Sequence, residues 1–348
     1  MSAVTRSILL FMLKAVAVVL PVVAVAVAWY VNADPFKVLG HYDCYLPDPV
    51  KYPVRVGINK GLITVTNFHD RLAEGRNYDA FIFGSSVSCY YDARTWASLA
   101  DTTGLAGAYH FDSSGETLTA MADKVRYLHS IDQPIRYALV VLDPIIMAGD
   151  NTSGPAVVNP PQLHKSLCER IKYHYTFFRA ATNADFFKSW IPYLLTGKAY
   201  ANGRNLLFEP QPIVYDPAVN QEAIPQWDSV ISVDPQAFYA EYPLIPSPDT
   251  VTVSPAVITP VKAEALRSIA EVFAAHGTDY KIIIGPNRNK VALNPADLQL
   301  MRQIFVPECV YDFSADMAYE LECDTMLYDN THYRPAYALR LMLRAYGK

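Results

Sequence analysis

The sequence predicts an α/β protein: a three-layer α/β/α sandwich around a mostly parallel sheet, preceded by one transmembrane helix. Three observations predict this architecture. An uncharged apolar run stands near the N-terminus, short apolar runs that end in turns recur through the rest of the chain, and helical patterns separate several of them. Buried strands that alternate with helices are typical of parallel sheets covered on both faces.

The first 31 residues predict a transmembrane anchor. Residues 15–31 carry no charge, and at about 1.5 Å per residue this run approaches the hydrocarbon thickness of a bilayer once Lys14 snorkels outward. Trp29 and Tyr30 stand at its far end, where aromatic side chains favour the membrane interface. Because Arg6 and Lys14 precede the run, the positive-inside rule predicts that the rest of the chain lies outside the cytoplasm.

The competing interpretation of this segment is a cleaved signal peptide, since residues 24–28 offer two Ala-x-Ala patterns. The length of the apolar run favours an uncleaved anchor. In both interpretations the main domain is exported. We therefore expect a single-pass protein of a bacterial cytoplasmic membrane whose large domain is periplasmic.

The strands and helices can be placed from local patterns. Five short apolar runs predict buried strands: residues 80–83, 108–111, 137–142, 280–284 and 310–313. Periodic apolar positions predict helices: residues 66–74, 117–130, 163–181, 185–195, 260–276, 294–305 and 335–346. Their alternation is the basis of the predicted parallel sheet.

The predicted domain spans residues 77–348, and residues 32–76 form a linker and a surface-packed segment. Residues 149–259 break the strand–helix rhythm and predict an aromatic, proline-rich insertion that packs over the sheet. Its aromatic side chains either line a sugar-binding surface or simply form core: Tyr173, Tyr175, Phe177, Phe178, Trp190, Trp227, Phe238, Tyr239 and Tyr242.

Composition argues against several classes of function. The net charge is −5 and Lys and Arg do not cluster, so a nucleic-acid partner is not expected. The five cysteines show no metal-binding spacing; one disulfide, Cys309–Cys323, and free buried thiols are both compatible with the sequence. We expect no metal and no cofactor.

Three segments that follow predicted strands carry groups suited to chemistry. Ser85 and Ser86 follow Gly84 directly after the first strand, where a hydroxyl is exposed at a tight turn or simply caps a helix. Gly115 follows the second strand at a helix start, where a backbone N–H stabilises negative charge; a serine-capped turn is the alternative.

The third segment is Asp329-Asn330-Thr331-His332, just before the last predicted helix. An imidazole abstracts a hydroxyl proton near neutral pH, and a carboxylate three residues away can orient it. Such a pair is also found in ordinary surface loops. Its order after the serine turn and the glycine segment is what favours a catalytic site.

A serine in a Gly-x-Ser turn after the first strand, a glycine in the second block and a C-terminal Asp-x-x-His resemble the SGNH/GDSL hydrolase superfamily. The resemblance covers about residues 77–346, with Gly84-Ser85-Ser86 in place of the usual Gly-Asp-Ser. It implies that Ser86 is the nucleophile, His332 the base and Asp329 its partner. It further implies that the N–H groups of Ser86 and Gly115 form the oxyanion hole.

The chain departs from this family in the third block. The family supplies Gly-x-Asn-Asp there, whereas this chain has Asp143-Pro144 after the strand. An ionised Asp143 would repel an oxyanion, and loss of one donor costs about 3–4 kcal/mol in comparable sites. Asn287 is the candidate substitute from another loop, and we expect Ser85 and Asp143 to lie beside the substrate.

The GSS turn and the anchor resemble extracytoplasmic SGNH-like proteins of polysaccharide O-acetylation and teichoic-acid D-alanylation. The resemblance implies a serine esterase or O-acyltransferase acting on acyl, chiefly acetyl, esters of an envelope or exported polysaccharide, with a membrane-bound O-acyltransferase as partner. The alternative is a non-catalytic SGNH-like protein that binds a glycan or assists envelope assembly. A metal-dependent phosphoesterase is a third class, disfavoured because the histidines lack paired carboxylates.

Overall fold

The computed structural model describes most of the chain. The described residues are 3–42, 55–56, 59–104, 107–150, 154, 157, 159–163, 166–196, 207–208, 213–316 and 324–348. Cys44 and Cys323 lie outside these ranges, and with them the predicted Cys309–Cys323 disulfide. Cys89, Cys168 and Cys309 are free thiols.

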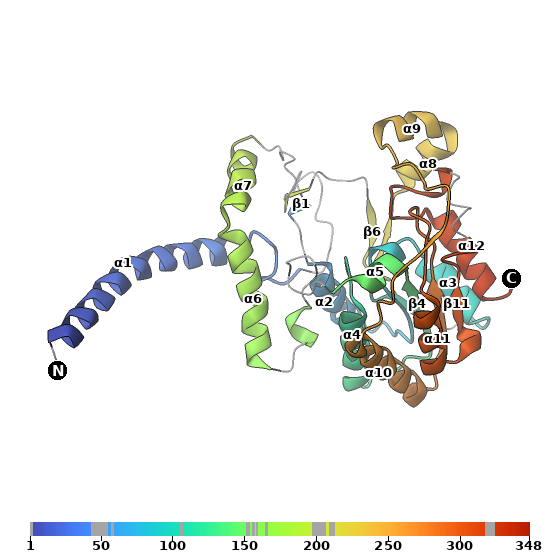
Figure 1. The fold of residues 1–348 in the computed structure, drawn as a ribbon, viewed down its shortest axis with the longest axis horizontal. Coiled ribbons are helices and arrows are strands. Elements are labelled where there is room, and N and C mark those ends of the chain that lie inside the picture. Colours follow the sequence, from blue (N-terminus) through green and yellow to red (C-terminus); the bar gives the residue numbers. More distant parts are fainter. Residues whose placement is uncertain are drawn as a thin grey trace.

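The N-terminal helix α1 (Ala3–Ala33) extends away from the rest of the protein (Figure 1). The most apolar 18-residue stretch within Val4–Ala33 has a mean hydropathy of 2.8, and none of it is buried inside the described part of the protein. Length and composition therefore make α1 able to span a bilayer.

The central sheet has five strands in the order β11-β9-β4-β2-β3. Their bounds are β2 Ala80–Gly84, β3 Ala108–His110, β4 Tyr137–Leu142, β9 Asp279–Ile284 and β11 Val310–Asp312. Every pairing between these strands is parallel. The five predicted strands are thus present, within one residue at each end, and the mostly parallel α/β fold is confirmed.

Alternate strand residues enter two hydrophobic clusters, one on each face of the sheet. Phe81 and Phe83 pack with α2, α4, α10 and α11, while Ala80 and Ile82 pack with α3 and α12. The helices of the first cluster are α2 Lys60–Ala73, α4 Leu118–Ser130, α10 Pro260–His276 and α11 Pro295–Ile304. Those of the second are α3 Ala93–Ala100 and α12 Pro335–Ala345.

Local capping explains where these helices begin and end. Thr259 caps α10 and Gly277 ends it with a left-handed φ of 60°. Helix α2 begins at Lys60, six residues earlier than its apolar pattern predicts, because the Asn59 side chain accepts a hydrogen bond from the N–H of Leu62. Helix α2, which lies in the segment predicted to pack on the domain surface, also packs into the main core through Val65 and Phe68.

The insertion divides into two parts with different neighbours. Helices α6 (Leu167–Ala181) and α7 (Ala184–Thr196) pack against the end of α1. The hairpin β6–β7 (Val214–Asp216, Gln221–Ala223) joins the edge of β3, where the His110 N–H donates to the Val219 carbonyl. Helices α8 (Pro225–Val233) and α9 (Pro235–Glu241) were not predicted, because their short turns follow prolines without a clear apolar period.

The remaining elements are short. They are η1 Ser86–Ser88, α5 Pro144–Ala148, η2 Pro161–Leu163, η3 Pro307–Cys309 and η5 Asp324–Met326, with strands β1 Arg55–Val56, β5 Leu207–Phe208, β8 Thr252–Val253 and β10 Val291–Ala292. Strands β1 and β5 pair antiparallel, and β8 and β10 pair parallel.

Candidate functional site

The candidate site lies at the carboxyl edge of the sheet, where strand β2 lies between the two sheet strands that follow it in the sequence, β3 and β4. Strand β2 pairs with β3 on one side and β4 on the other, so the two crossover connections leave in opposite directions. Such a switch point opens a crevice beyond the strand ends in doubly wound sheets. Ser86 follows β2 and Asp143 follows β4 at this point.

The turn after β2 is tight and is held by its own serines. A Cβ atom on Gly84 would lie 2.6 Å from the Ser88 side chain and 3.0 Å from the Val141 carbonyl, so only glycine fits here. The Ser88 hydroxyl donates to the Ser85 carbonyl at 2.7 Å, and the Ser85 hydroxyl accepts from the N–H of Val87. Ser85 is therefore buried as the cap of the 3-10 turn, the structural alternative considered for it.

Ser86 occupies the first position of that turn, and its side chain is partly exposed. The next helix, α3, begins only at Ala93, behind its own cap, Asp92. Within the described chain, the Ser86 hydroxyl makes no hydrogen bond. It is therefore the one hydroxyl of this turn that is not used to hold the turn together.

The second predicted segment runs beside the same turn. The Ser113 N–H donates to the Gly84 carbonyl at 3.3 Å, which brings the chain after β3 against the end of β2. Gly115 is exposed and has a φ of +59°, and a Cβ atom there would lie 2.9 Å from Val157. This backbone conformation requires glycine and presents the peptide at the carboxyl edge of the sheet.

Asp329 and His332 form a rigid carboxylate–imidazole pair. Asp329 Oδ2 lies 2.8 Å from His332 Nδ1, and Asp329 Oδ1 accepts from the N–H groups of Thr331 and His332, each at 2.8 Å. Burial alone would raise the pKa of Asp329. The hydrogen bond and the charge of the His332 ring, together with the hydrogen bonds from the two N–H groups, outweigh burial and hold this pKa below its usual value. The pair fixes the ring with Nε2 directed away from the carboxylate.

Aromatic contacts bring this pair to the serine turn. The Tyr90 ring, four residues after Ser86, lies 6.1 Å from the His332 ring and 4.9 Å from that of Tyr328. The Tyr333 hydroxyl donates to the Pro286 carbonyl at 2.8 Å, which fixes the loop at the end of β9. No hydrogen bond joins Ser86 to His332, both of which are described. The carboxylate–imidazole half of the predicted relay is formed, and the serine half is not.

Two further predicted residues are used within their own loops. Asp143 is buried and accepts from the N–H of Ile145 at 2.7 Å, which caps α5. The Asn287 amide donates to the Val291 carbonyl at 2.8 Å, and its oxygen accepts from the Val291 N–H at 3.1 Å. The carbonyl oxygen and one amide hydrogen of Asn287 are therefore both hydrogen-bonded to Val291.

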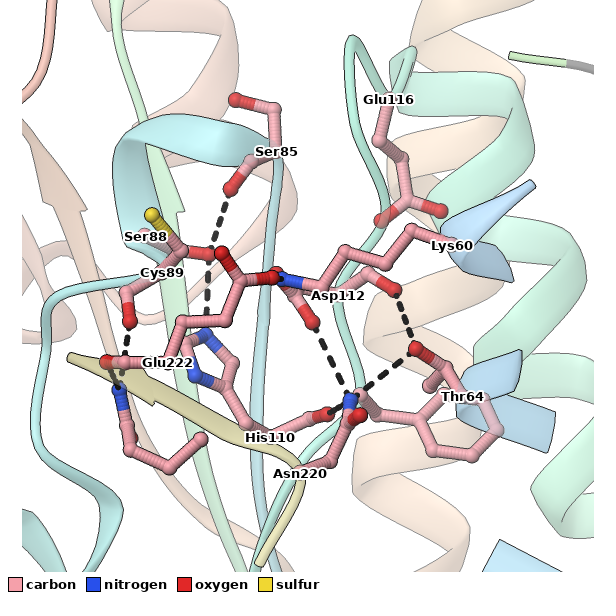
Figure 2. A network of polar contacts seen from close by, with 12 residues as sticks. Lys60, Thr64, Ser85, Ser88, Cys89, His110, Asp112, Glu116, Asn220 and Glu222 are labelled. Atoms are coloured by element: carbon pink, nitrogen blue, oxygen red, sulfur yellow. Dashed lines mark hydrogen bonds and ion pairs between the residues drawn. The ribbon is translucent and has the colours of Figure 1, made fainter. Parts of the chain in front are cut away.

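A buried charge network beneath the serine turn was not foreseen (Figure 2). Lys60 Nζ lies 2.5 Å from Asp112 Oδ2 and 2.7 Å from Glu222 Oε1, and all three side chains are buried. Burial alone would raise the pKa of Asp112, but the Lys60 charge lowers it. Asn220 donates to Asp112 as well, at 3.3 Å. The network ties α2, the end of β3 and the β6–β7 hairpin together.

His110 connects this network to the serine turn. Its Nε2 lies 3.1 Å from the Ser88 hydroxyl, and burial lowers its pKa, so the neutral ring is favoured. The nearby thiol of Cys89 is fully buried, which raises its pKa and makes it a poor nucleophile. Local patterns did not indicate this arrangement, because Lys60 stands in the segment predicted to pack on the domain surface and Glu222 stands in the predicted insertion.

The second half of the insertion forms an aromatic wall beside the Asp329–His332 loop. The Trp227 ring lies 6.0 Å from that of Tyr328, and Phe238 packs in the same cluster. Arg334 Nε lies 2.7 Å from Asp228 Oδ1, an ion pair that joins this wall to the loop. These aromatic residues are core next to the site; their role as a sugar-binding surface stays a prediction.

Within the ranges that the structure describes, no three His, Cys, Asp or Glu side chains are grouped so that they could hold a metal ion. No protein-family model, no curated protein and no solved structure matches the chain.

Proposed function

We propose that the protein is an SGNH-type serine esterase or O-acyltransferase with a three-layer α/β/α domain on the periplasmic side of a bacterial cytoplasmic membrane. Helix α1 would be its anchor. The observation that carries the proposal is the 2.8 Å contact between Asp329 and the Nδ1 of His332, at the sheet edge where Ser86 presents an unused hydroxyl. A hydroxyl beside an oriented imidazole is the arrangement needed for nucleophilic acyl transfer.

In the proposed reaction, Ser86 Oγ attacks the acyl carbonyl while its proton passes to His332 Nε2. Asp329 stabilises the imidazolium through Nδ1. The Oγ–carbon bond forms, the ester C–O bond breaks, and the departing alkoxide takes the proton from Nε2. Water or a glycan hydroxyl then attacks the acyl-serine by the same route, which gives hydrolysis or transfer. The N–H groups of Ser86 and Gly115 are the proposed oxyanion donors.

The reaction requires the Ser86 hydroxyl to reach His332 Nε2, a hydrogen bond that the described structure does not contain. A rotation about the Cα–Cβ bond exchanges staggered rotamers and moves a serine Oγ by about 2.4 Å, and catalytic hydrogen bonds are often loose before substrate binds. The acyl donor and the polysaccharide acceptor are proposed from the resemblance, as is a membrane-bound O-acyltransferase that supplies the acyl group across the membrane.

Hydrolysis of a small acetyl ester and labelling by a serine-directed phosphonate test the proposal. We expect the intact chain to do both, and Ser86→Ala to lose about 10³-fold or more of the hydrolysis and all label at that site. Ser98→Ala, at an exposed serine on α3, is the matched control and should leave both unchanged. Hydrolysis that persists in Ser86→Ala would refute the mechanism.

A second candidate function is non-catalytic glycan binding or assistance to envelope assembly. Two observations favour it: Ser86 is not bonded to His332, and Asp143 stands where the family has the asparagine donor, with its carboxylate committed to capping α5. Glycan binding measured by calorimetry should then survive Ser86→Ala and His332→Ala together, while no ester is turned over. Turnover by the unmodified chain would exclude this alternative.

A further inference from the structure

Helix α6 has two apolar faces, and only one of them is covered by protein. Tyr173 and Phe177 are fully buried in a cluster with Phe36 from the chain after α1. Ile171 and Tyr175 precede these two by two residues each, which places them about 160° away around the helix axis. Ile171 and Tyr175 are each 59% exposed.

The second apolar face runs along the whole helix: it is exposed over the first part and packs against α1 near the end. Leu167 is 72% exposed and stands one turn before Ile171. Phe178 stands seven residues after Ile171 on the same face, and its ring packs at 5.6 Å against that of Tyr30 near the end of α1. The stripe formed by Leu167, Ile171 and Tyr175, the α6 stripe, therefore starts where α6 touches the apolar helix.

The direction of α6 fits a membrane surface. Figure 1 shows α6 and α7 running across the end of α1 rather than along it. The Trp29 ring of α1 lies 5.0 Å from that of Phe187 in α7, so aromatic side chains meet where α1 joins this helix pair. If α1 spans the bilayer, α6 lies in the plane of its surface, the orientation of an interfacial amphipathic helix.

Basic side chains flank the stripe on both sides. Arg170 and Lys172 are the residues next to Ile171 and lie about 100° to either side of it. Both are exposed, as is Arg179 one turn before the end of the helix. None of the three forms an ion pair within the described residues, although the chain as a whole has a net charge of −5. Long basic side chains in this position reach anionic headgroups.

We propose that the α6 stripe inserts into the interface of an anionic lipid bilayer, with Arg170, Lys172 and Arg179 against its headgroups. The inference rests on the proposed membrane anchoring by α1, and it does not depend on whether Ser86 is catalytic. It makes α6 a second membrane contact, which fixes how the domain is oriented above the surface rather than leaving it on a flexible tether.

The test is electron paramagnetic resonance of the full chain in vesicles of phosphatidylethanolamine and phosphatidylglycerol. A nitroxide-bearing amino acid replaces Ile171, and its collisions with oxygen, which concentrates in lipid, are compared with those with a water-soluble nickel chelate. Val233 in α8, 86% exposed and outside the insertion part that touches α1, gives the matched aqueous control. Val18 in α1 gives the lipid reference.

We expect the oxygen-to-nickel ratio at position 171 to be several-fold above that at position 233 and below that at position 18. The ratio at 171 should fall in Arg170→Gln/Lys172→Gln, or when phosphatidylcholine replaces the anionic lipid. A lipid-like ratio at 18 with an aqueous ratio at 171 would overturn this inference and leave the anchor intact. An aqueous ratio at 18 would overturn the anchoring itself, and dipolar broadening at 171 would assign the stripe to a second copy of the chain.

Discussion

Replacing Lys60 with methionine is expected to destabilise the protein more than any exposed charge substitution would. The Lys60 ammonium lies 2.5 Å from Asp112 and 2.7 Å from Glu222, and all three side chains are buried. Removing one partner of a buried ion pair costs about 3–5 kcal/mol, because a charge is left without compensation. Two carboxylates lose their counter-charge here, so we expect the upper part of that range.

The stability lost in Lys60→Met depends on pH. The pKa of Asp112 is lowered in the native protein, so its contribution to stability is present above the unfolded-state pKa and is lost as pH falls through the folded value. Without Lys60, burial raises the pKa of the Asp112 carboxyl. The contribution of Asp112 to stability is then present at low pH and is lost as pH rises through the new folded-state pKa. The difference between Lys60→Met and the unmodified protein should therefore shrink on going from neutral to mildly acidic pH.

Urea unfolding followed by tryptophan fluorescence measures this difference. Lys188→Met is the control, since Lys188 is 66% exposed and pairs only with the neighbouring Asp185; such surface pairs contribute about 0–1 kcal/mol. Adding Asp112→Asn and Glu222→Gln to Lys60→Met should restore most of the stability. If Lys60→Met costs no more than Lys188→Met, or if its cost grows on acidification, the reasoning is refuted.

Three further outcomes are expected. Burial raises the pKa of Glu116 from 4.5 to about 7, against the opposing effect of its ion pair with Lys124. Stability should therefore fall by about 3 kcal/mol as pH rises from the unfolded-state pKa through that value, and Glu116→Gln should flatten this slope in urea unfolding. A Cβ at Gly285 would lie 2.2 Å from the Tyr333 hydroxyl, so Gly285→Ala should cost about 1–3 kcal/mol of stability, most of it regained by adding Tyr333→Phe. Asp329→Asn should retain the fold by circular dichroism but lower ester hydrolysis by about 10³–10⁴-fold, because the His332 tautomer is no longer held.

Much of the sheet was predictable because its strands are short, apolar and ended by turn residues. Residues 137–142 and 260–276 coincide with a strand and a helix of the structure, since both have strong local signals at each end. Ser86 and Gly115 stand after the neighbouring strands β2 and β3, so parallel pairing alone places them at the same edge of the sheet. The Asp329–His332 loop does not directly follow a strand, and its link to the serine turn is the contact between the Tyr90 and His332 rings.

The parts that sequence reasoning missed are those set by contacts between distant segments. Lys60 is buried because it pairs with Asp112 and Glu222, which are far from it in the sequence. The local pattern of apolar and polar residues does not show that a lysine is buried. Helices α8 and α9 were missed because each is short and begins at a proline, Pro225 or Pro235, in a passage without clear periodicity. The position of Ser86 relative to His332 is set by two loops that are far apart in the sequence, which no local pattern encodes.

Helix α2 joins the proposed membrane surface to the proposed site. In its first turn, Leu62 packs in the cluster that covers the buried face of α6, while Lys60 holds Asp112 beneath the serine turn. Gly61 lies between them, and a Cβ there would come within 3.0 Å of the Ser113 hydroxyl, so α2 runs directly against the segment that follows β3. We expect a displacement of α6 to be transmitted through this turn to groups next to Ser113. In the proposed orientation on a bilayer, this packing would set the height and tilt of the serine turn, which suits a site that meets an acceptor or a partner held at the membrane surface.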